Sequence, residues 1–218
     1  MKKKHCDISK YKINFDKTKF DTIVQKSGLL NKDTFPFQRL QECLSIDKNK
    51  ISLNKIEAAL KDDNPYERIA QILADYLRKE LLESENKFSF ETVFSHESKV
   101  DFIKTAKEKG YKVYLYFVST EDPDINVYRV KEVRVKEHGH DVDEDKIRSR
   151  YYRSMDFLHE ASQHCYQVYF FDNSKDGKGQ TMFAHFKVDA ENKKQWDPLD
   201  KTIIPRWFYT YYSEKAKD

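Results

Sequence analysis

Two apolar runs, 111–120 (YKVYLYFVST) and 166–174 (YQVYFFDNS), constrain the fold of this chain most strongly. Both are rich in aromatic and β-branched residues, which favour buried strands. Between them lie two helical patterns, one starting at Asp122-Pro123 and one capped by Asp143. A strand, a helical crossover and a second strand form the pattern of a parallel βαβ unit. The sequence therefore predicts an α/β fold, a parallel sheet with crossover helices.

Other segments extend this prediction. Helical spacing of apolar residues predicts a helix over 17–26 and an amphipathic helix that begins at Asn64-Pro65. We expect a strand over 87–92, then a helix that is capped by Ser95 and stops at Gly110. The segment 181–188 is predicted as an edge strand, and the aromatic segment 205–212 is expected to cover the core. We divide the chain into a poorly readable helical segment, 1–63, and an α/β core, 64–218.

Composition limits the possible classes of protein. The 40 basic and 37 acidic residues balance too evenly to indicate a nucleic-acid-binding protein. The basic start MKKKHCDISKYK has no apolar run behind it, so we expect neither signal peptide nor membrane anchor, and a cytoplasmic protein. Three cysteines, Cys6, Cys43 and Cys165, are widely spaced and form no CxxC pair, so they are predicted to be free thiols.

Polar residues follow each of the three predicted core strands: Glu91-Thr92, Ser119-Thr120-Glu121 and Asp172-Asn173-Ser174. The carboxyl ends of parallel strands face one side of a sheet, where α/β proteins bind ligands. For Ser119 and Thr120 we favour a structural role in capping the next helix. Glu91 and Thr92 have no such role if Ser95 is the cap, so we interpret them as functional.

A cluster of basic residues spans 129–153 and includes two histidines in the link HGHD. Most of these charges fit a solvated helix face. Arg134 and Arg150 differ, because a helical hairpin would place them over the strand ends, where arginine offers a fork of donors to phosphate oxygens. His138 and His140 form an HxH pair without a third ligand at a suitable spacing, so no metal site is predicted.

These blocks together resemble the zeta-toxin-like kinases, P-loop enzymes that phosphorylate small molecules. The resemblance runs from about residue 64 to 174 and is carried by FSFETVFSHESK, AKEKGYKVYLYFVSTEDPDINVYRV, GHDVDEDKIRSRYYRS and YFFDNS. It implies that Glu91, Thr92 and His140 contact the substrate, that Arg134 and Arg150 clamp phosphate, and that Asn173 lies by the nucleotide. The segment 12–30 also resembles an insertion of one bacterial subfamily.

The chain departs from this family at the nucleotide phosphates. Family members begin with a strand and a GxxxxGK[ST] loop that holds phosphates and magnesium, and no segment here matches it. DGKGQT, at 176–181, has the wrong glycine spacing and is interpreted as a turn. The catalytic aspartate of the family's Asn-x-Asp motif has no clear counterpart, although Asp16 stands in Asn14-Phe15-Asp16. His138 also replaces the first glycine of the link.

Because the missing strand is central in P-loop folds, its loss is expected to leave a hydrophobic slot or an unpaired edge. Three sources could fill the place of this strand: a segment from an upstream start or a split gene, a second polypeptide or homodimer, or the N-terminal residues of this chain. We favour an upstream start or a split gene. The leading hypothesis is therefore the body of an ATP- and Mg²⁺-dependent small-molecule kinase that is inactive as written, with an antitoxin-like protein as a further possible partner. The alternative is a non-catalytic module that binds a nucleotide-like ligand or a protein. We expect no membrane or nucleic-acid partner.

Overall fold

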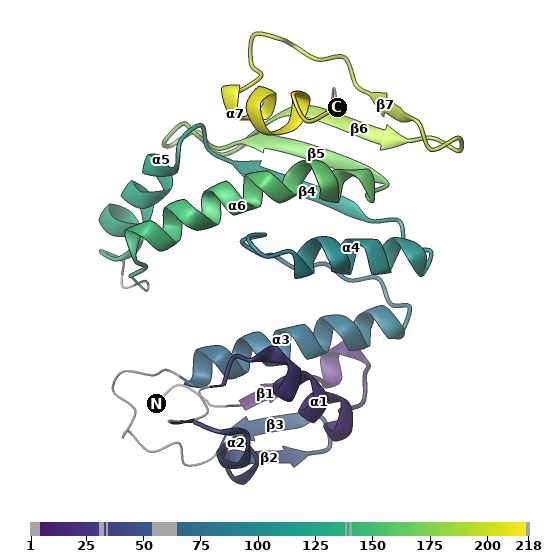
Figure 1. Ribbon diagram of the computed structural model, residues 1–218, viewed down its shortest axis with the longest axis vertical. Helices are drawn as coiled ribbons and strands as arrows, with labels where there is room; N and C mark the ends of the chain where they lie inside the picture. Colours follow the sequence, from purple (N-terminus) through teal and green to yellow (C-terminus); the bar gives the residue numbers. More distant parts are fainter. Residues whose placement is uncertain are drawn as a thin grey trace. The chain divides into compact units, whose positions relative to one another are not determined.

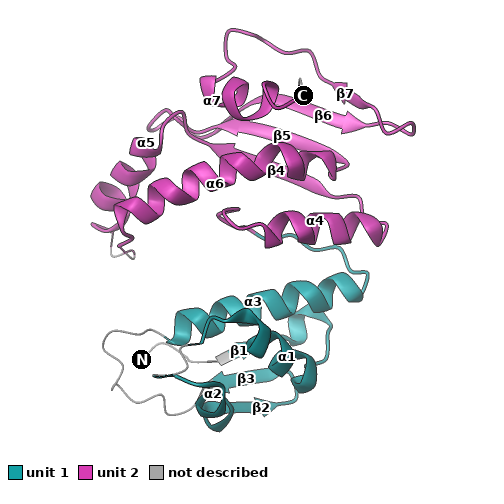
Figure 2. Cartoon of the chain, in the orientation of Figure 1, with its two compact units in different colours: residues 1–90 teal, residues 91–218 magenta. Residues whose placement is uncertain are grey.

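The computed structural model describes residues 5–30, 33, 35–53, 65–137, 139 and 141–216, and the chain divides into two compact units (Figure 2). The first unit spans residues 1–90 and the second spans residues 91–218. The sequence analysis placed a boundary after residue 63 instead. Helix α3 (Pro65–Glu83) accounts for this difference, because it packs against α1 (Lys17–Ser27) within the first unit.

The first unit holds a small antiparallel sheet in the order β1 (His5–Asp7), β3 (Lys50–Leu53), β2 (Leu44–Asp47), together with η1 (Ser9–Tyr11), α1, α2 (Phe37–Cys43) and α3. These short strands were not predicted. The predicted helices at 17–26 and after Asn64 are confirmed as α1 and α3, although Asn64 itself lies outside the described residues. The carboxylate of Asp16 caps α1 by accepting a hydrogen bond from the N–H of Lys19, and the hydroxyl of Tyr76 in α3 accepts one from the N–H of Asp16.

The second unit contains a four-stranded sheet in the order β4 (Tyr114–Ser119), β5 (Gln167–Asp172), β6 (Thr181–Val188), β7 (Lys194–Trp196). Strands β4 and β5 are parallel, as predicted, whereas β6 and β7 are antiparallel to their neighbours, so the sheet is mixed. The prediction of β6 as an edge strand is wrong, because β6 lies between β5 and β7. Strands β4 and β5 pair directly with each other, and β4 and β7 are the two edge strands of the described sheet.

The crossover between β4 and β5 consists of α5 (Pro123–Tyr128), the π-helical segment η2 (Arg129–Arg134) and α6 (Glu144–Gln163). Asp122 and Asp143 cap α5 and α6 as predicted, by accepting hydrogen bonds from the N–H groups of Asp124 and Lys146. The predicted inner stripe of α6 is buried: Ile147, Tyr151, Met155, Leu158 and Ala161. Figure 1 shows α6 running across β4 and β5.

The predicted strand over 87–92 is wrong, since residues 86–95 form neither helix nor strand. The aromatic side chains of this segment are instead anchors: Phe88 packs in a core cluster of the first unit, and Phe94 is buried in the core of the second. Ser95 is not the cap of the following helix, α4 (Ser98–Glu108). The N-cap position is Glu97, whose side chain makes no capping bond, and the ring of His96 instead accepts a hydrogen bond through Nδ1 from the N–H of Ser98 at 3.2 Å.

The helices of the second unit cover one face of its sheet, which we call the inner face. Phe117, Val168 and Phe170 of this face share a buried cluster with residues of α4, α6 and the C-terminal turns α7 (Arg206–Phe208) and η3 (Tyr209–Ser213). The aromatic tail covers the core as expected, since Trp207, Phe208 and Tyr212 are buried. The opposite, outer face carries exposed Tyr114, Tyr116, Val118 and Met182. Within the described residues, no helix combines the length and the apolar character needed to cross a membrane.

Candidate functional site at the ends of β4 and β5

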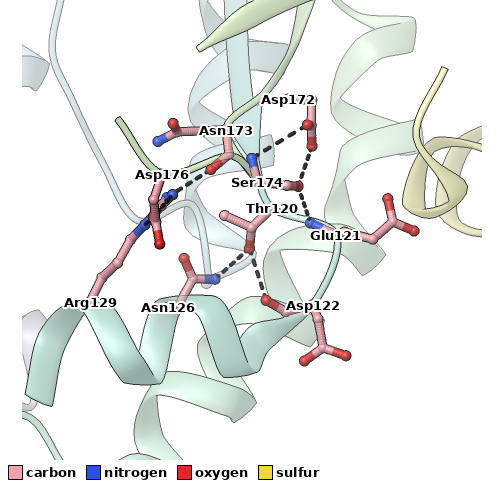
Figure 3. A network of polar contacts seen from close by, with 9 residues as sticks. All are labelled: Thr120, Glu121, Asp122, Asn126, Arg129, Asp172, Asn173, Ser174 and Asp176. Carbon is pink, nitrogen blue, oxygen red and sulfur yellow. Dashed lines mark hydrogen bonds and ion pairs between the residues drawn. The ribbon is translucent and has the colours of Figure 1, made fainter. Parts of the chain in front are cut away.

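The carboxyl ends of β4 and β5 lie side by side, because the two strands are parallel and in register from Tyr114 to Ser119. The N–H of Asn173 donates to the carbonyl of Ser119 at 2.7 Å. The N–H of Glu121 donates to Ser174 Oγ at 2.7 Å, and that hydroxyl donates to Asp172 Oδ1 at 2.6 Å (Figure 3). The two predicted strand ends therefore meet in one polar network.

Arg129, the first residue of η2, binds this network to the crossover. Its Nη1 donates to the carbonyl of Asn173 at 2.7 Å, while Nη2 and Nε donate to Asp176 Oδ1 at 2.7 and 3.1 Å. The sequence analysis had placed Arg129 on a solvated helix face. The sequence contains a signal that was missed: Asn126 and Arg129 lie three residues apart, so they share one helix face, and both side chains point toward the strand ends.

Thr120 does not cap α5 as predicted, because Asp122 is the N-cap, but it has a structural role in the turn before the helix. Its buried hydroxyl donates to the carbonyl of Asp122 at 3.1 Å and accepts from Asn126 Nδ2 at 3.0 Å. Its carbonyl accepts from the hydroxyl of Tyr151 on α6 at 2.9 Å. Burial raises the pKa of Tyr151, so the phenol remains protonated and acts as a donor. These bonds fix the turn that leads from β4 into α5.

The side chain of Asn173 is the least constrained polar group at this edge. Its backbone is held on both sides, by Ser119 and by Arg129, whereas its amide points away from the network in Figure 3. Asp172, by contrast, is held by Ser174 and by the indole N–H of Trp207 at 3.4 Å. Asn173 thus presents a fixed backbone with an amide that is available to a ligand, while the role proposed for it beside a nucleotide stays a prediction.

Helices α5 and α6 form the predicted hairpin, which meets the strand ends through Asn126, Arg129 and Tyr151. Helices α5 and α6 pack against each other, and Arg148 of α6 pairs with Asp124 at the start of α5. Lys131 Nζ donates to Asp141 Oδ1 at 2.7 Å, and this bond holds the pKa of Asp141 below its usual range. Both contacts lie at the surface, so each stabilises the hairpin only weakly.

Arg134 and Arg150 both belong to this hairpin, and neither pairs with a carboxylate within the described part of the chain. Arg134 is exposed at the end of η2, where its carbonyl accepts the N–H of Gly139 at 2.8 Å. A Cβ at Gly139 would clash with Arg134 Cγ and would lie 2.7 Å from the Arg134 carbonyl oxygen, so the link requires glycine here. Arg150 precedes Tyr151, whose hydroxyl reaches the end of β4. Both guanidinium groups are available to an anion.

The remaining predicted residues do not join the network. Glu91 and Thr92 are exposed in a segment without regular structure, and the hydroxyl of Thr92 accepts from the N–H of Phe94 at 3.2 Å. Among the described residues, neither side chain bonds to the ends of β4 or β5, so the argument from a strand end fails for them. Their role in substrate binding now rests on the resemblance alone. His140 and His138 lie outside the described residues.

Among the described residues, this edge offers neither a cluster of metal ligands nor a backbone cradle for phosphate. Within the described ranges, no three His, Cys, Asp or Glu side chains are grouped so as to hold a metal ion. The backbone N–H groups of Glu121 and Asn173 already donate to Ser174 and Ser119, so they do not form a cradle for nucleotide phosphates. The described residues therefore do not fit ATP and Mg²⁺ by themselves.

Comparison with known proteins places few constraints on this chain. No family model matches, and no solved structure matches. An uncharacterized protein of Haemophilus influenzae (strain ATCC 51907 / DSM 11121 / KW20 / Rd) is 39% identical over 64 residues. The match covers 29% of this chain and 45% of that protein, so the chain spans less than half the length of this relative.

Proposed function

We propose that the second unit is the body of a zeta-toxin-like small-molecule kinase, and that the 218-residue chain does not transfer phosphate by itself. The observation that carries this proposal is that two parallel strand ends meet and are joined by a helical hairpin, and that this hairpin carries two arginines that lack a described ion pair. Ligand sites of α/β proteins form at such edges, and arginine charge stabilises the transition state of phosphoryl transfer.

The proposed roles follow from position. Arg129 holds the carbonyl of Asn173 and so fixes the end of β5 beside the hairpin. The Asn173 amide would contact a nucleotide, and Arg134 and Arg150 would bind the phosphate that is transferred. Glu91, Thr92 and His140 remain proposed contacts to the hydroxyl-bearing substrate. A phosphate-binding loop must come from a segment that this sequence does not contain.

The test has two stages. First, the purified chain is incubated with Mg²⁺ and ATP, and we expect no hydrolysis above a protein-free blank; magnesium-dependent turnover would contradict the proposal. Second, the chain is completed with the strand and GxxxxGK[ST] segment of a zeta-toxin-like kinase, and phosphate transfer to nucleotide-linked amino sugars and other hydroxyl acceptors is measured. Turnover by the completed form is the result that supports a kinase body.

Two substitutions then test the hairpin. In the completed form, Arg134→Ala and Arg150→Ala should each lower turnover by about 10³-fold, the scale of a transition-state arginine. Arg148→Ala is the matched control, because Arg148 already pairs with Asp124 and Glu144 on the same hairpin. If all three variants retain the same turnover, Arg134 and Arg150 are not part of the site.

The second candidate function is a non-catalytic module that binds a nucleotide-like ligand or a protein. It is favoured by the internal pairing of the strand-end N–H groups, which leaves side chains as the main available donors. Calorimetric titration of the purified chain with ADP and nucleotide sugars separates the two candidates. Binding that Asn173→Ala weakens, together with a completed form that shows no turnover, supports the module.

A further inference from the structure

Strand β4 is an edge strand without the features that usually protect an edge. Its sequence, YLYFVS, contains no charge and no proline, and no described strand pairs with its second edge. Its outward side chains Tyr114, Tyr116 and Val118 are 47%, 60% and 44% exposed. Natural edge strands are normally kept short, charged or covered, because an unprotected edge pairs with another strand.

An aromatic stack on the outer face ends at this edge. Tyr116, Tyr169 and His185 occupy paired positions on β4, β5 and β6. The rings of Tyr116 and Tyr169 are parallel within 4° with centroids 4.7 Å apart, and Tyr169 stacks on His185 at 4.2 Å. One face of the Tyr116 ring is therefore covered by Tyr169, while the other faces the open edge of the sheet.

We propose that a second copy of this chain pairs with β4 through antiparallel strand addition, about a two-fold axis at Tyr116. A two-fold axis makes the interface self-complementary, so each copy covers the open edge of the other. This register sets Tyr116 opposite Tyr116 of the second copy and Tyr114 opposite its Val118. The two aromatic stacks then continue into each other, and the two sheets become one sheet of eight strands.

The charges that flank β4 fit this arrangement. Lys112 precedes the strand and Glu121 follows it, and both residues are exposed. Within its own chain, Lys112 Nζ lies 4.9 Å from the centroid of the Tyr166 ring, and Glu121 Oε2 accepts a hydrogen bond from the N–H of Arg206 at 3.1 Å. In the proposed register Lys112 lies opposite Thr120 of the second copy and next to its Glu121, and the same pair forms again at the other end. A parallel arrangement would instead set lysine beside lysine. The charge pattern thus selects the antiparallel register.

The buried area predicts a weak dimer. Aromatic side chains bury roughly 150–250 Å² each when fully covered. If the interface covers about half of the Tyr114, Tyr116 and Val118 side chains in each copy, the two copies together bury a few hundred Å². Stable interfaces bury more than about 1,000 Å². Backbone hydrogen bonds along β4 add to this, and we expect a dimer that forms at micromolar concentrations and dissociates on dilution. The dimer needs no ligand, so it can be tested on the purified 218-residue chain without any assay of kinase activity.

Cysteine cross-linking tests the register. Opposite Cα atoms in an antiparallel pair lie about 4.5–5.5 Å apart, within reach of a disulfide. Tyr116→Cys, on a Cys6→Ser background that removes the partly exposed thiol, should therefore form a disulfide dimer under mild oxidation. Tyr114→Cys is the matched control, because its Cα would lie about 14 Å from the same position of the second copy. We expect at least tenfold slower cross-linking of Tyr114→Cys.

Oligomeric state gives the second readout. Light scattering during size exclusion should show the mass rising toward that of a dimer between about 1 and 100 µM, the range expected for a small interface, and Tyr116→Lys should remain a monomer with an unchanged circular dichroism spectrum. A wild-type monomer at the highest concentration overturns the proposal. Equal cross-linking rates at positions 114 and 116 overturn the register, and a dimer that persists in Tyr116→Lys places the interface elsewhere.

Discussion

Replacement of Arg129 by alanine should destabilise the second unit by about 2 kcal/mol, and most of this loss should come from one hydrogen bond. The guanidinium group makes two kinds of contact: a hydrogen bond to the carbonyl of Asn173 at 2.7 Å and an ion pair with Asp176 at 2.7 Å. A hydrogen bond from a charged donor contributes about 1.5–3 kcal/mol when the acceptor is withdrawn from water. The Arg129 side chain is only 25% exposed, which favours this range.

The Asp176 contact should contribute much less. The side chain of Asp176 is 71% exposed, and ion pairs at such positions contribute about 0–1 kcal/mol and are screened by salt. Asp176→Asn should therefore lower the free energy of unfolding by less than about 1 kcal/mol. The loss in Arg129→Ala should persist at high salt, whereas the smaller loss in Asp176→Asn should disappear.

The two tryptophans make this measurement specific to one unit. Trp196 and Trp207 are the only tryptophans of the chain, and both lie in the second unit. Urea unfolding followed by tryptophan fluorescence, at low and high salt, gives the free energy of unfolding of that unit for each variant. If Asp176→Asn costs as much as Arg129→Ala, the carbonyl of Asn173 is not the main partner and the reasoning is refuted.

Two further predictions use the same probe. Phe170→Ala, at a fully buried position of the inner face, should cost about 3–5 kcal/mol, whereas Tyr169→Ala, on the outer face, should cost roughly 0.5–2 kcal/mol; equal losses would mean that the outer face is also a core. Burial lowers the pKa of His159, with Lys194 and Lys215 acting in the same direction. The unfolded state then binds the proton more tightly, so stability is full above about pH 6.5 and falls as pH decreases through the lowered pKa. His159→Gln should flatten this dependence in urea titrations between about pH 7.5 and 5, and an unchanged slope would exclude His159 as its source.

The helices and strands that were predicted correctly are specified by residues that lie close together in the sequence. Helices α1, α3, α5 and α6 are defined by caps and by apolar spacing within a few residues, and β4 and β5 by continuous aromatic and β-branched runs. The parallel pairing of β4 and β5 also followed from the chain, because a helical crossover of this length links parallel neighbours. The meeting of Asn173 with Ser119 was a direct consequence of that pairing.

The features that depend on contacts with residues distant in the sequence were decided by the tertiary structure. Residues 87–92 have the composition of a strand, yet a strand needs a partner for its backbone, and the packing of Phe88 and Phe94 sets the path of this segment instead. Arg129 and Arg134 lie on one basic stretch, and helical spacing can place Arg129 on the face of Asn126 but cannot name its partner, which the position of the end of β5 decides. The open edge of β4 is likewise absent from local sequence, because the number of strands beside a strand is a property of the whole sheet.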